Sequence, residues 1–265
     1  MSLVYIHQLG VSGPGLHGWD ETKKILRGEQ PYVAAEYEKP TTSILPKNEH
    51  RRTTSLIKLA LSVAQDAVSH SDYAASALAA VFASADGDLE ITHKICLALN
   101  MPDKPVSPTY FHNSVHNAAA GYWAIATHSS APSTSICAYD NTFAAGLLEA
   151  VCQVRIGQQP VLLVVYDYNP PFPLSACRTY RDPFAVSFLL TADAHKQNLC
   201  EVQIDLLQGN QPAAEQDELP LPLENPDACA LKLLQPLAMR KDATVTLDYN
   251  YCQQLTIRLR HANNS

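Results

Sequence analysis

The sequence lacks the features that would assign it to a membrane or to a secretory route. It contains no apolar run of about eighteen residues, so we predict no membrane-spanning helix. The opening Met-Ser-Leu-Val-Tyr-Ile-His has no basic region ahead of an apolar core, and it is typical of a β-strand rather than of a signal peptide. Internal repeats and low-complexity segments are also absent.

Positive charge and paired cysteines are scarce too. There are 19 Lys and Arg residues against 26 Asp and Glu, and the resulting net charge of −7 argues against nucleic acid and anionic membrane as partners. The seven cysteines are an odd number, and none are spaced Cys-x-x-Cys. Scattered cysteines in apolar segments behave as small hydrophobic residues. We therefore expect free thiols, a cytoplasmic location and no zinc.

Common catalytic and cofactor motifs are missing. The glycine-rich residues 10–18 have neither Walker spacing nor a Gly-x-Gly-x-x-Gly leading into a helix. Neither Gly-x-Ser-x-Gly nor His-Glu-x-x-His occurs. His112 and His116 are four residues apart, as two metal ligands on a helix would be, but a third ligand and a general base do not accompany them. We expect these histidines to be structural or to lie at an interface, and we expect no metal or other cofactor.

The first two thirds of the chain alternate between strand and helix patterns. A helix stripe of small and branched apolar residues begins after Thr53 or Thr54. Such alternation predicts a layered α/β fold with a mostly parallel sheet. The predicted strands span residues 3–9, 78–84, 161–167 and 184–190, and the other predicted helices span 19–28, 90–99 and 114–128.

The last third has a different pattern. Residues 201–207 are consistent with a strand, and residues 208–227 are polar and proline-rich, as in a surface loop. Residues 243–249 and 255–260 alternate with a period of two, which predicts a closing β-hairpin.

The most informative stretch is residues 132–150. Residues 133–139 form a β-branched run typical of a buried strand, and Asp140-Asn-Thr then begin a helix. A strand that leads into a helix N-terminus exposes free N–H groups and the positive end of the helix dipole. Enzymes often place a nucleophile there. Here the position holds Asp140, which is interpreted as a plain helix cap, as the replacement of a lost nucleophile, or as both at once.

This stretch also carries a family resemblance. Pro-Ser-x-Ser-Ile, followed after three residues by Asp140 and a helix of small residues, resembles the nucleophile segment of β-ketoacyl synthases. In that family the residue aligned with Asp140 is the cysteine that carries the acyl chain. The resemblance spans residues 2–193 and departs at Asp140 and in the absence of the second half, which holds two catalytic histidines. It implies a thiolase-like α/β fold, the N-terminal ketosynthase half with a layered mixed sheet, and a C-terminal half truncated to a few strands.

The resemblance also implies a domain division and a function. We expect a ketosynthase-like domain at residues 1–195 and a short β extension at 196–265 packed on it. Chain-length-factor subunits, including those of the aryl-polyene type, are nucleophile-free relatives that pair with an active β-ketoacyl synthase. They shape its acyl tunnel in fatty-acid or polyketide (polyene) biosynthesis. We predict such a non-catalytic subunit, whose partner supplies the catalytic Cys and both His.

The same resemblance suggests which residues meet the partner. Acyl carrier protein is a second predicted partner, with Arg51-Arg52 interpreted either as its contact or as a solvated helix start. We expect no catalytic residue in this chain, and we expect a set of tunnel or interface residues that comprises Tyr110, Phe111, His112, Asn113, His116, Tyr122, Asp140 and Phe143.

Two other functions stay open on the sequence. One is a stand-alone acyltransferase or decarboxylase that uses Cys137 with His112 or His116, although a cysteine in the middle of a strand is usually inert. The other is a homodimeric acyl-binding scaffold. Arg178 and Arg181 flank Tyr180 in a loop, and we expect solvated charges there rather than a ligand clamp.

Overall fold

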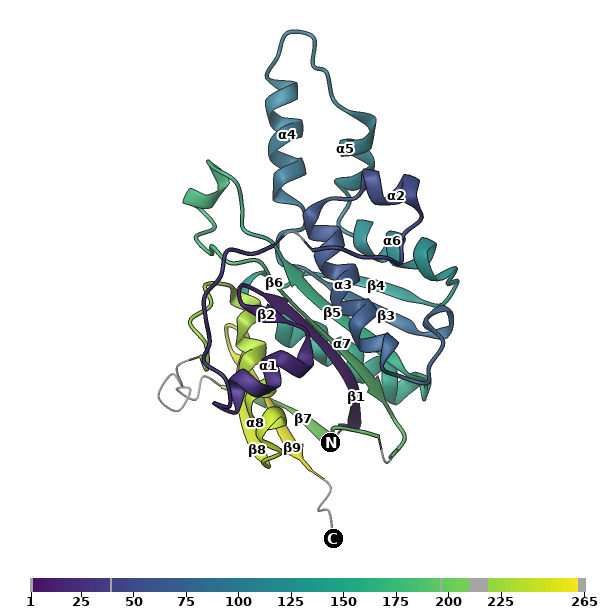
Figure 1. Cartoon of the computed structure of the whole chain (residues 1–265), viewed down its shortest axis with the longest axis vertical. Coiled ribbons are helices and arrows are strands. Elements are labelled where there is room, and N and C mark those ends of the chain that lie inside the picture. The colour runs from purple at the N-terminus through teal and green to yellow at the C-terminus, as the bar shows by residue number, and fades with distance from the viewer. Residues whose placement is uncertain (1, 39, 196, 210–218, 262–265) are drawn as a thin grey trace.

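The computed structural model describes residues 2–38, 40–195, 197–209 and 219–261, and in it the chain folds around one mixed β-sheet (Figure 1). The sheet order is β4-β3-β5-β6-β1-β7-β9-β8, and the short β2 pairs with β1. The strands are β1 (Ser2–Gly13), β2 (Leu16–His17), β3 (Ala79–Ala83), β4 (Ser133–Ile136), β5 (Val161–Asp167), β6 (Phe184–Thr191), β7 (Cys200–Gln208), β8 (Ala243–Asn250) and β9 (Gln253–Arg260).

Helices cover both faces of the sheet and make a three-layer arrangement. Two core clusters result, one beneath α3 and α6 and the other beneath α7 and α8. None of the described helices has the length and apolar character needed to cross a bilayer. The helices are α1 (Trp19–Leu26), α2 (Lys47–Arg52), α3 (Ser55–Ser69), α4 (Leu89–Leu99), α5 (Pro108–Asn113), α6 (Ala118–Thr127), α7 (Thr142–Gly157) and α8 (Leu231–Met239).

Several predicted elements are confirmed by the structure. Strand β5 has the predicted bounds, and every residue of β5 and β6 is buried, as expected for strands covered on both faces. Helix α3 begins after Thr54, whose hydroxyl accepts the Ile57 N–H at 3.2 Å, and it buries the predicted apolar stripe. Residues 243–260 form the predicted hairpin of β8 and β9.

The expectation of a mostly parallel sheet is wrong. Only β4, β3 and β5 run parallel to one another, and the remaining neighbours pair antiparallel. Parallel neighbours need a long crossover, usually a helix. Helices connect β3 to β4 and β4 to β5, whereas the connection from β5 to β6 contains only one short 3-10 turn (Leu174–Ala176), and β6 returns antiparallel.

Three local predictions also differ from the structure. Residues 133–139 are a strand only as far as Ile136, and β4 lies at the sheet edge, where it is partly exposed rather than buried. The helix predicted at 114–128 is shorter, since α6 spans only Ala118–Thr127, and the separate helix α5 precedes it, begun by the Ser107 hydroxyl, which accepts the Tyr110 N–H. The loop predicted at 208–227 lies partly outside the described residues, and its described end includes the buried Leu221 and Leu223. The sequence pattern also missed α8 entirely.

One pair of helices projects beyond the layers. We call residues 89–113, which comprise α4, α5 and their connection, the arm (Figure 1). Only Ile91 and Asn113 are buried within the arm. Its apolar side chains Leu97, Leu99 and Phe111 are 51%, 51% and 70% exposed.

Two helix glycines provide a test of the packing. In α7, a Cβ on Gly146 would lie 2.9 Å from the Ala83 Cβ of β3 and 3.2 Å from a Leu163 methyl group of β5. In α6, a Cβ on Gly121 would meet no atom within 4 Å. We expect Gly146→Ala to lower the free energy of unfolding by about 1–3 kcal/mol through overpacking. Gly121→Ala, the matched control, should raise it by about 0.5–1 kcal/mol through helix propensity.

Urea denaturation of the isolated chain measures both changes. Equal stabilisation by the two substitutions would contradict the close approach of α7 to the sheet.

Candidate functional site

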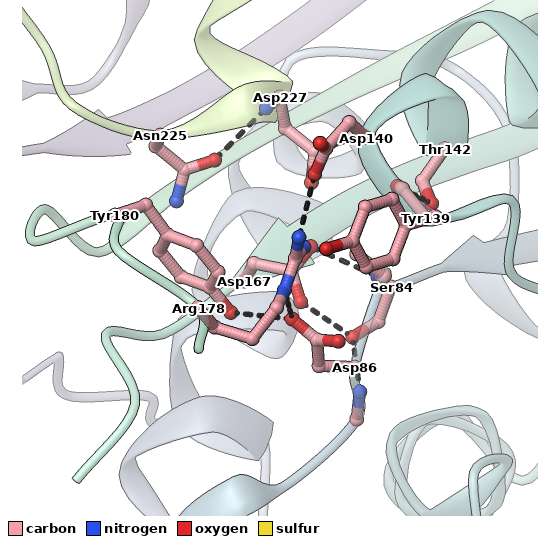
Figure 2. A network of polar contacts seen from close by, with 12 residues as sticks. Ser84, Asp86, Tyr139, Asp140, Thr142, Asp167, Arg178, Tyr180, Asn225 and Asp227 are labelled. Carbon is pink, nitrogen blue, oxygen red and sulfur yellow. Dashed lines mark hydrogen bonds and ion pairs between the residues drawn. The ribbon is translucent and has the colours of Figure 1, made fainter. Parts of the chain in front are cut away.

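The candidate site lies where the three parallel strands end. Asp86 follows β3, Asp140 follows β4, and Asp167 is the last residue of β5. Since the carboxyl ends of parallel strands meet at one edge of a sheet, the loops that follow them form a natural site. Figure 2 shows these carboxylates gathered around Arg178, which comes from the loop between β5 and β6.

Arg178 joins the three loops. Its Nε donates to Asp86 Oδ2 and its Nη1 to Asp140 Oδ1, each at 2.7 Å. The guanidinium carbon lies 3.9 Å from the centre of the Tyr139 ring, which is close enough for a cation–π interaction. Only 13% of the Arg178 side chain is exposed. The expectation of a solvated arginine is therefore wrong here, although Arg181 is 81% exposed as expected.

The contacts in this network shift the pKa values of Arg178 and Tyr180. Burial alone would lower the pKa of Arg178, but hydrogen bonds to Asp140 and Asp86 outweigh it and shift the pKa upward. Burial, followed by the charges of Asp167 and Asp86, raises the pKa of Tyr180. Tyr180 is thus a neutral phenol that donates to Asp86 Oδ2 at 3.1 Å.

The turn before α7 is held in an uncommon conformation. Tyr139 has φ +53°, a left-handed value that costs energy for a residue other than glycine. The Thr142 hydroxyl accepts the Ala138 N–H at 3.0 Å and donates to the Tyr139 carbonyl at 2.7 Å, which fixes the turn from both sides. Tyr139 is consequently 58% exposed and covers one face of the Arg178 guanidinium.

Asp140 does not cap α7, so that interpretation is wrong. It lies in a 3-10 turn (Tyr139–Asn141), and the capping position belongs to Asn141, whose side chain makes no capping hydrogen bond. The Asp140 carboxylate instead pairs with Arg178, and 55% of its side chain is exposed. The ion pair attracts the carboxylate more strongly than an uncharged N–H group would.

Beneath the ion pairs lie two fully buried carboxyl groups. Asp167 accepts the Ser84 hydroxyl at 2.8 Å and the Ala85 N–H at 2.9 Å. Asp227 lies in a 3-10 turn (Pro226–Ala230) of the C-terminal segment. Burial, followed by the charge and hydrogen bonding of Asp167, raises the pKa of Asp227 well above the usual range. Burial raises the pKa of Asp167 as well, and of these two carboxyls Asp227 is the one whose pKa is raised further, so it keeps its proton to higher pH.

The residues predicted for an interface fall into two groups. Tyr110, Phe111 and His112 are exposed on the arm. Asn113 is buried, donates to the Arg52 carbonyl at 2.7 Å and accepts the Tyr122 hydroxyl at 3.0 Å.

His116 and Phe143 make contacts inside the chain. The His116 Nε2–H donates to the Ser84 carbonyl at 2.9 Å, and Phe143 is buried against Phe188. No group of three metal-ligating side chains occurs among the residues that the structure describes.

Cys137 differs from its expected setting. It lies beyond the end of β4 and is exposed, rather than buried in the middle of a strand. Within the described ranges, no histidine side chain hydrogen-bonds to it. A nearby pocket of about 400 Å³ is lined by Asn169, Pro170, Ser175, Thr179, Tyr180 and Arg181, which include no cysteine and no carboxylate. The described part of the site thus lacks a nucleophile paired with a base.

The sequence missed Asp86, Tyr139, Arg178 and Asp227 as site residues. Asp86 follows a buried strand, a signal that could have identified it. Arg178 and Asp227 carry no comparable local pattern, since their partners are distant in the sequence.

The chain was compared with known proteins by sequence and by structure. A family profile described as "Beta-ketoacyl synthase, N-terminal domain" matches residues 25–249. No curated protein sequence matches.

Three solved structures illustrate the structural likeness. A chain of a ketosynthase in complex with its chain length factor from Xenorhabdus doucetiae is 24% identical with TM-score 0.72, over 96% of this chain and 98% of that one. A chain of the ishigamide ketosynthase/chain length factor is 13% identical with TM-score 0.74, over 99% and 100%. A β-ketoacyl synthase from Burkholderia phymatum is 12% identical with TM-score 0.61, over 91% of this chain but 71% of that one.

The buried acid pair predicts a pH dependence of stability. Since the pKa of Asp227 is raised in the folded state, its stabilising contribution is full below about pH 4, where the unfolded chain is also protonated. The contribution is lost as the pH rises through the folded-state pKa. Asp227→Asn places a neutral amide beside Asp167 at every pH. We therefore expect the free energy of unfolding of the variant to be lower than that of the unchanged chain near pH 4. The difference should shrink as the pH rises toward 9, because only the unchanged chain loses stability there.

Urea denaturation between pH 4 and pH 9 tests this, with the exposed Asp103→Asn as the control that should follow the unchanged chain. A constant difference between Asp227→Asn and the unchanged chain at every pH would contradict the assignment of a neutral Asp227.

Proposed function

Because this chain belongs to the β-ketoacyl synthase N-terminal-domain family and has the thiolase-like fold predicted from its sequence, we propose that it is a non-catalytic subunit of the chain-length-factor kind. In this proposal it pairs with an active β-ketoacyl synthase and forms part of the wall of that enzyme's acyl tunnel. The catalytic cysteine and histidines belong to the partner.

The ion pair of Asp140 with Arg178 is the observation that carries the proposal. By its resemblance to β-ketoacyl synthases, residue 140 aligns with the cysteine that carries the acyl chain in that family. Here a carboxylate occupies it and forms an ion pair with the Arg178 guanidinium 2.7 Å away. A carboxylate bound in this way is a poor acyl carrier, because acylation would remove the charge that Arg178 binds. The position therefore serves structure in this chain rather than covalent chemistry.

The coverage of the matched structures supports the same proposal. The two matched chains from ketosynthase/chain length factor complexes align with this chain over almost their whole length, at 98% and 100%. Two ketosynthases of the bacillaene synthase are covered over only 46% and 48% of their chains. The aligned region thus corresponds to nearly the whole of the two components of such complexes and to slightly less than half of each of those synthases.

The exposed surface offers a place for a partner. Strand β4 pairs only with β3 and leaves one side of its backbone unpaired among the described strands, as an edge that another chain can cover. The arm presents Phe111 and Tyr110 to solvent, and α6 presents Ile125 at 46% exposure. Exposed apolar and aromatic side chains of this kind mark protein interfaces. We propose that this side meets the ketosynthase, with Tyr110 and Phe111 nearest its tunnel.

Co-expression with a candidate partner ketosynthase tests the pairing. We expect a stable 1:1 complex by native mass spectrometry. Phe111→Arg should weaken it at least about tenfold, because charge at the centre of an apolar interface commonly costs more than about 1–2 kcal/mol. The matched control is Ile156→Arg at the far end of α7, where an 85% exposed apolar side chain lies outside the proposed surface.

A monodisperse monomer in the presence of the ketosynthase would contradict the proposal. A homodimer that ignores the ketosynthase would instead support the acyl-binding scaffold.

A further inference from the structure

The arm has no core of its own to fix its direction. Only Ile91 and Asn113 are buried along residues 89–113, and α4 leads away from the sheet (Figure 1). Helix α4 contacts α5 through exposed side chains, such as the Lys94 ammonium 5.5 Å from the centre of the Tyr110 ring. The direction of the arm must therefore be set where its two ends join the body.

The first end is held by the polar network of the candidate site. Arg178 binds Asp86, two residues before the N-cap of α4, through an ion pair that is largely buried. The Ser84 hydroxyl donates to Asp167 and accepts the Gly87 N–H at 3.0 Å, which closes the turn between β3 and α4. Asp88 then caps α4 by accepting the Ile91 N–H at 3.0 Å.

The second end of the arm is also held at Ser84. His116, three residues beyond α5, donates from Nε2 to the Ser84 carbonyl at 2.9 Å. The hydroxyl of Ser84 thus contacts the first end of the arm and its carbonyl contacts the second. Asn113 adds a further anchor through the Arg52 carbonyl at 2.7 Å.

We infer that Arg178 and His116 are positioning residues that set the direction of the arm, Arg178 by holding its first end at Asp86 and His116 by holding its second end at Ser84. The anchoring is a property of this chain alone. Its consequence for acyl chain length rests on the proposed function, since there the arm presents Tyr110 and Phe111 to the partner's tunnel.

A small change in angle at the base of the arm produces a larger displacement at the far end of α4. With a rise of about 1.5 Å per residue, α4 extends roughly 16 Å, so a tilt of about 10° at its base displaces its far end by about 3 Å. That displacement is about the length of two carbon–carbon bonds. Loosening the ends should therefore broaden or shift product length without touching any catalytic group.

Hydrogen exchange of the isolated chain tests the anchoring directly. In Arg178→Lys, a single ammonium replaces a guanidinium that binds Asp86 and Asp140 at once. We expect amides of residues 89–99 to exchange about tenfold faster, with β5 and β6 unchanged. The matched control is Arg181→Lys on the same loop, where the arginine is 81% exposed. His116→Ala tests the second end independently, and His116→Gln, which retains a donor, should restore part of the protection.

Product length in the complex with a ketosynthase provides the second readout. Faster exchange in the arm together with a shifted length distribution would support both the anchoring and its consequence. Unchanged exchange in both Arg178→Lys and His116→Ala would overturn the anchoring, even if the chain pairs with a ketosynthase. Acceleration spread equally over β5 and β6 would also overturn it. If exchange rises in the arm but the unchanged chain never binds a ketosynthase, the anchoring is supported and the proposed function fails.

Discussion

A single guanidinium holds together the three loops that follow the parallel strands of this chain. Arg178 binds Asp86 after β3 and Asp140 after β4, and it packs against Tyr139. Removing one partner of a largely buried ion pair is expensive, commonly about 3–5 kcal/mol, because the other charge is left uncompensated. The conformation of the turn before α7 and the start of the arm both depend on this one side chain.

Under the proposed function, the same constraint explains how the turn before α7 can keep its conformation with Asp140 in place of a nucleophile. In the family resemblance this turn presents a reactive thiol, and here its carboxylate forms an internal contact. Beneath it, the buried Asp227 of the C-terminal segment lies close enough to Asp167, at the end of β5, for the charge of Asp167 to help raise the pKa of Asp227. The carboxyl groups of this region therefore serve mainly to connect segments that are distant in the sequence. In the proposed function, the partner supplies the catalytic residues and this chain supplies part of the tunnel wall.

The elements that were predicted correctly are those whose formation depends on residues close together in the sequence. The buried runs of β5 and β6, the stripe of α3 and the hairpin of β8 and β9 follow from apolar periodicity, and the thiolase-like fold follows from the motif around Asp140. The antiparallel pairing of β6 with β5 was missed, because the alternation of elements does not show that the connection between these two strands lacks a helix. Arg178 was misjudged because its partners lie 92 and 38 residues away in the sequence. The domain boundary near residue 195 and the interface roles of the predicted residues stay predictions.

The most direct test of the central claim is condensation activity with acyl- and malonyl-carrier substrates. It should be measured for this chain alone, for the candidate partner ketosynthase alone and for the two together. The account predicts activity only in the mixture, and the same activity with Asp140→Ala or Cys137→Ala, since neither residue carries the acyl group. Turnover by this chain alone, abolished by Cys137→Ala, would contradict it and would identify Cys137 as a nucleophile.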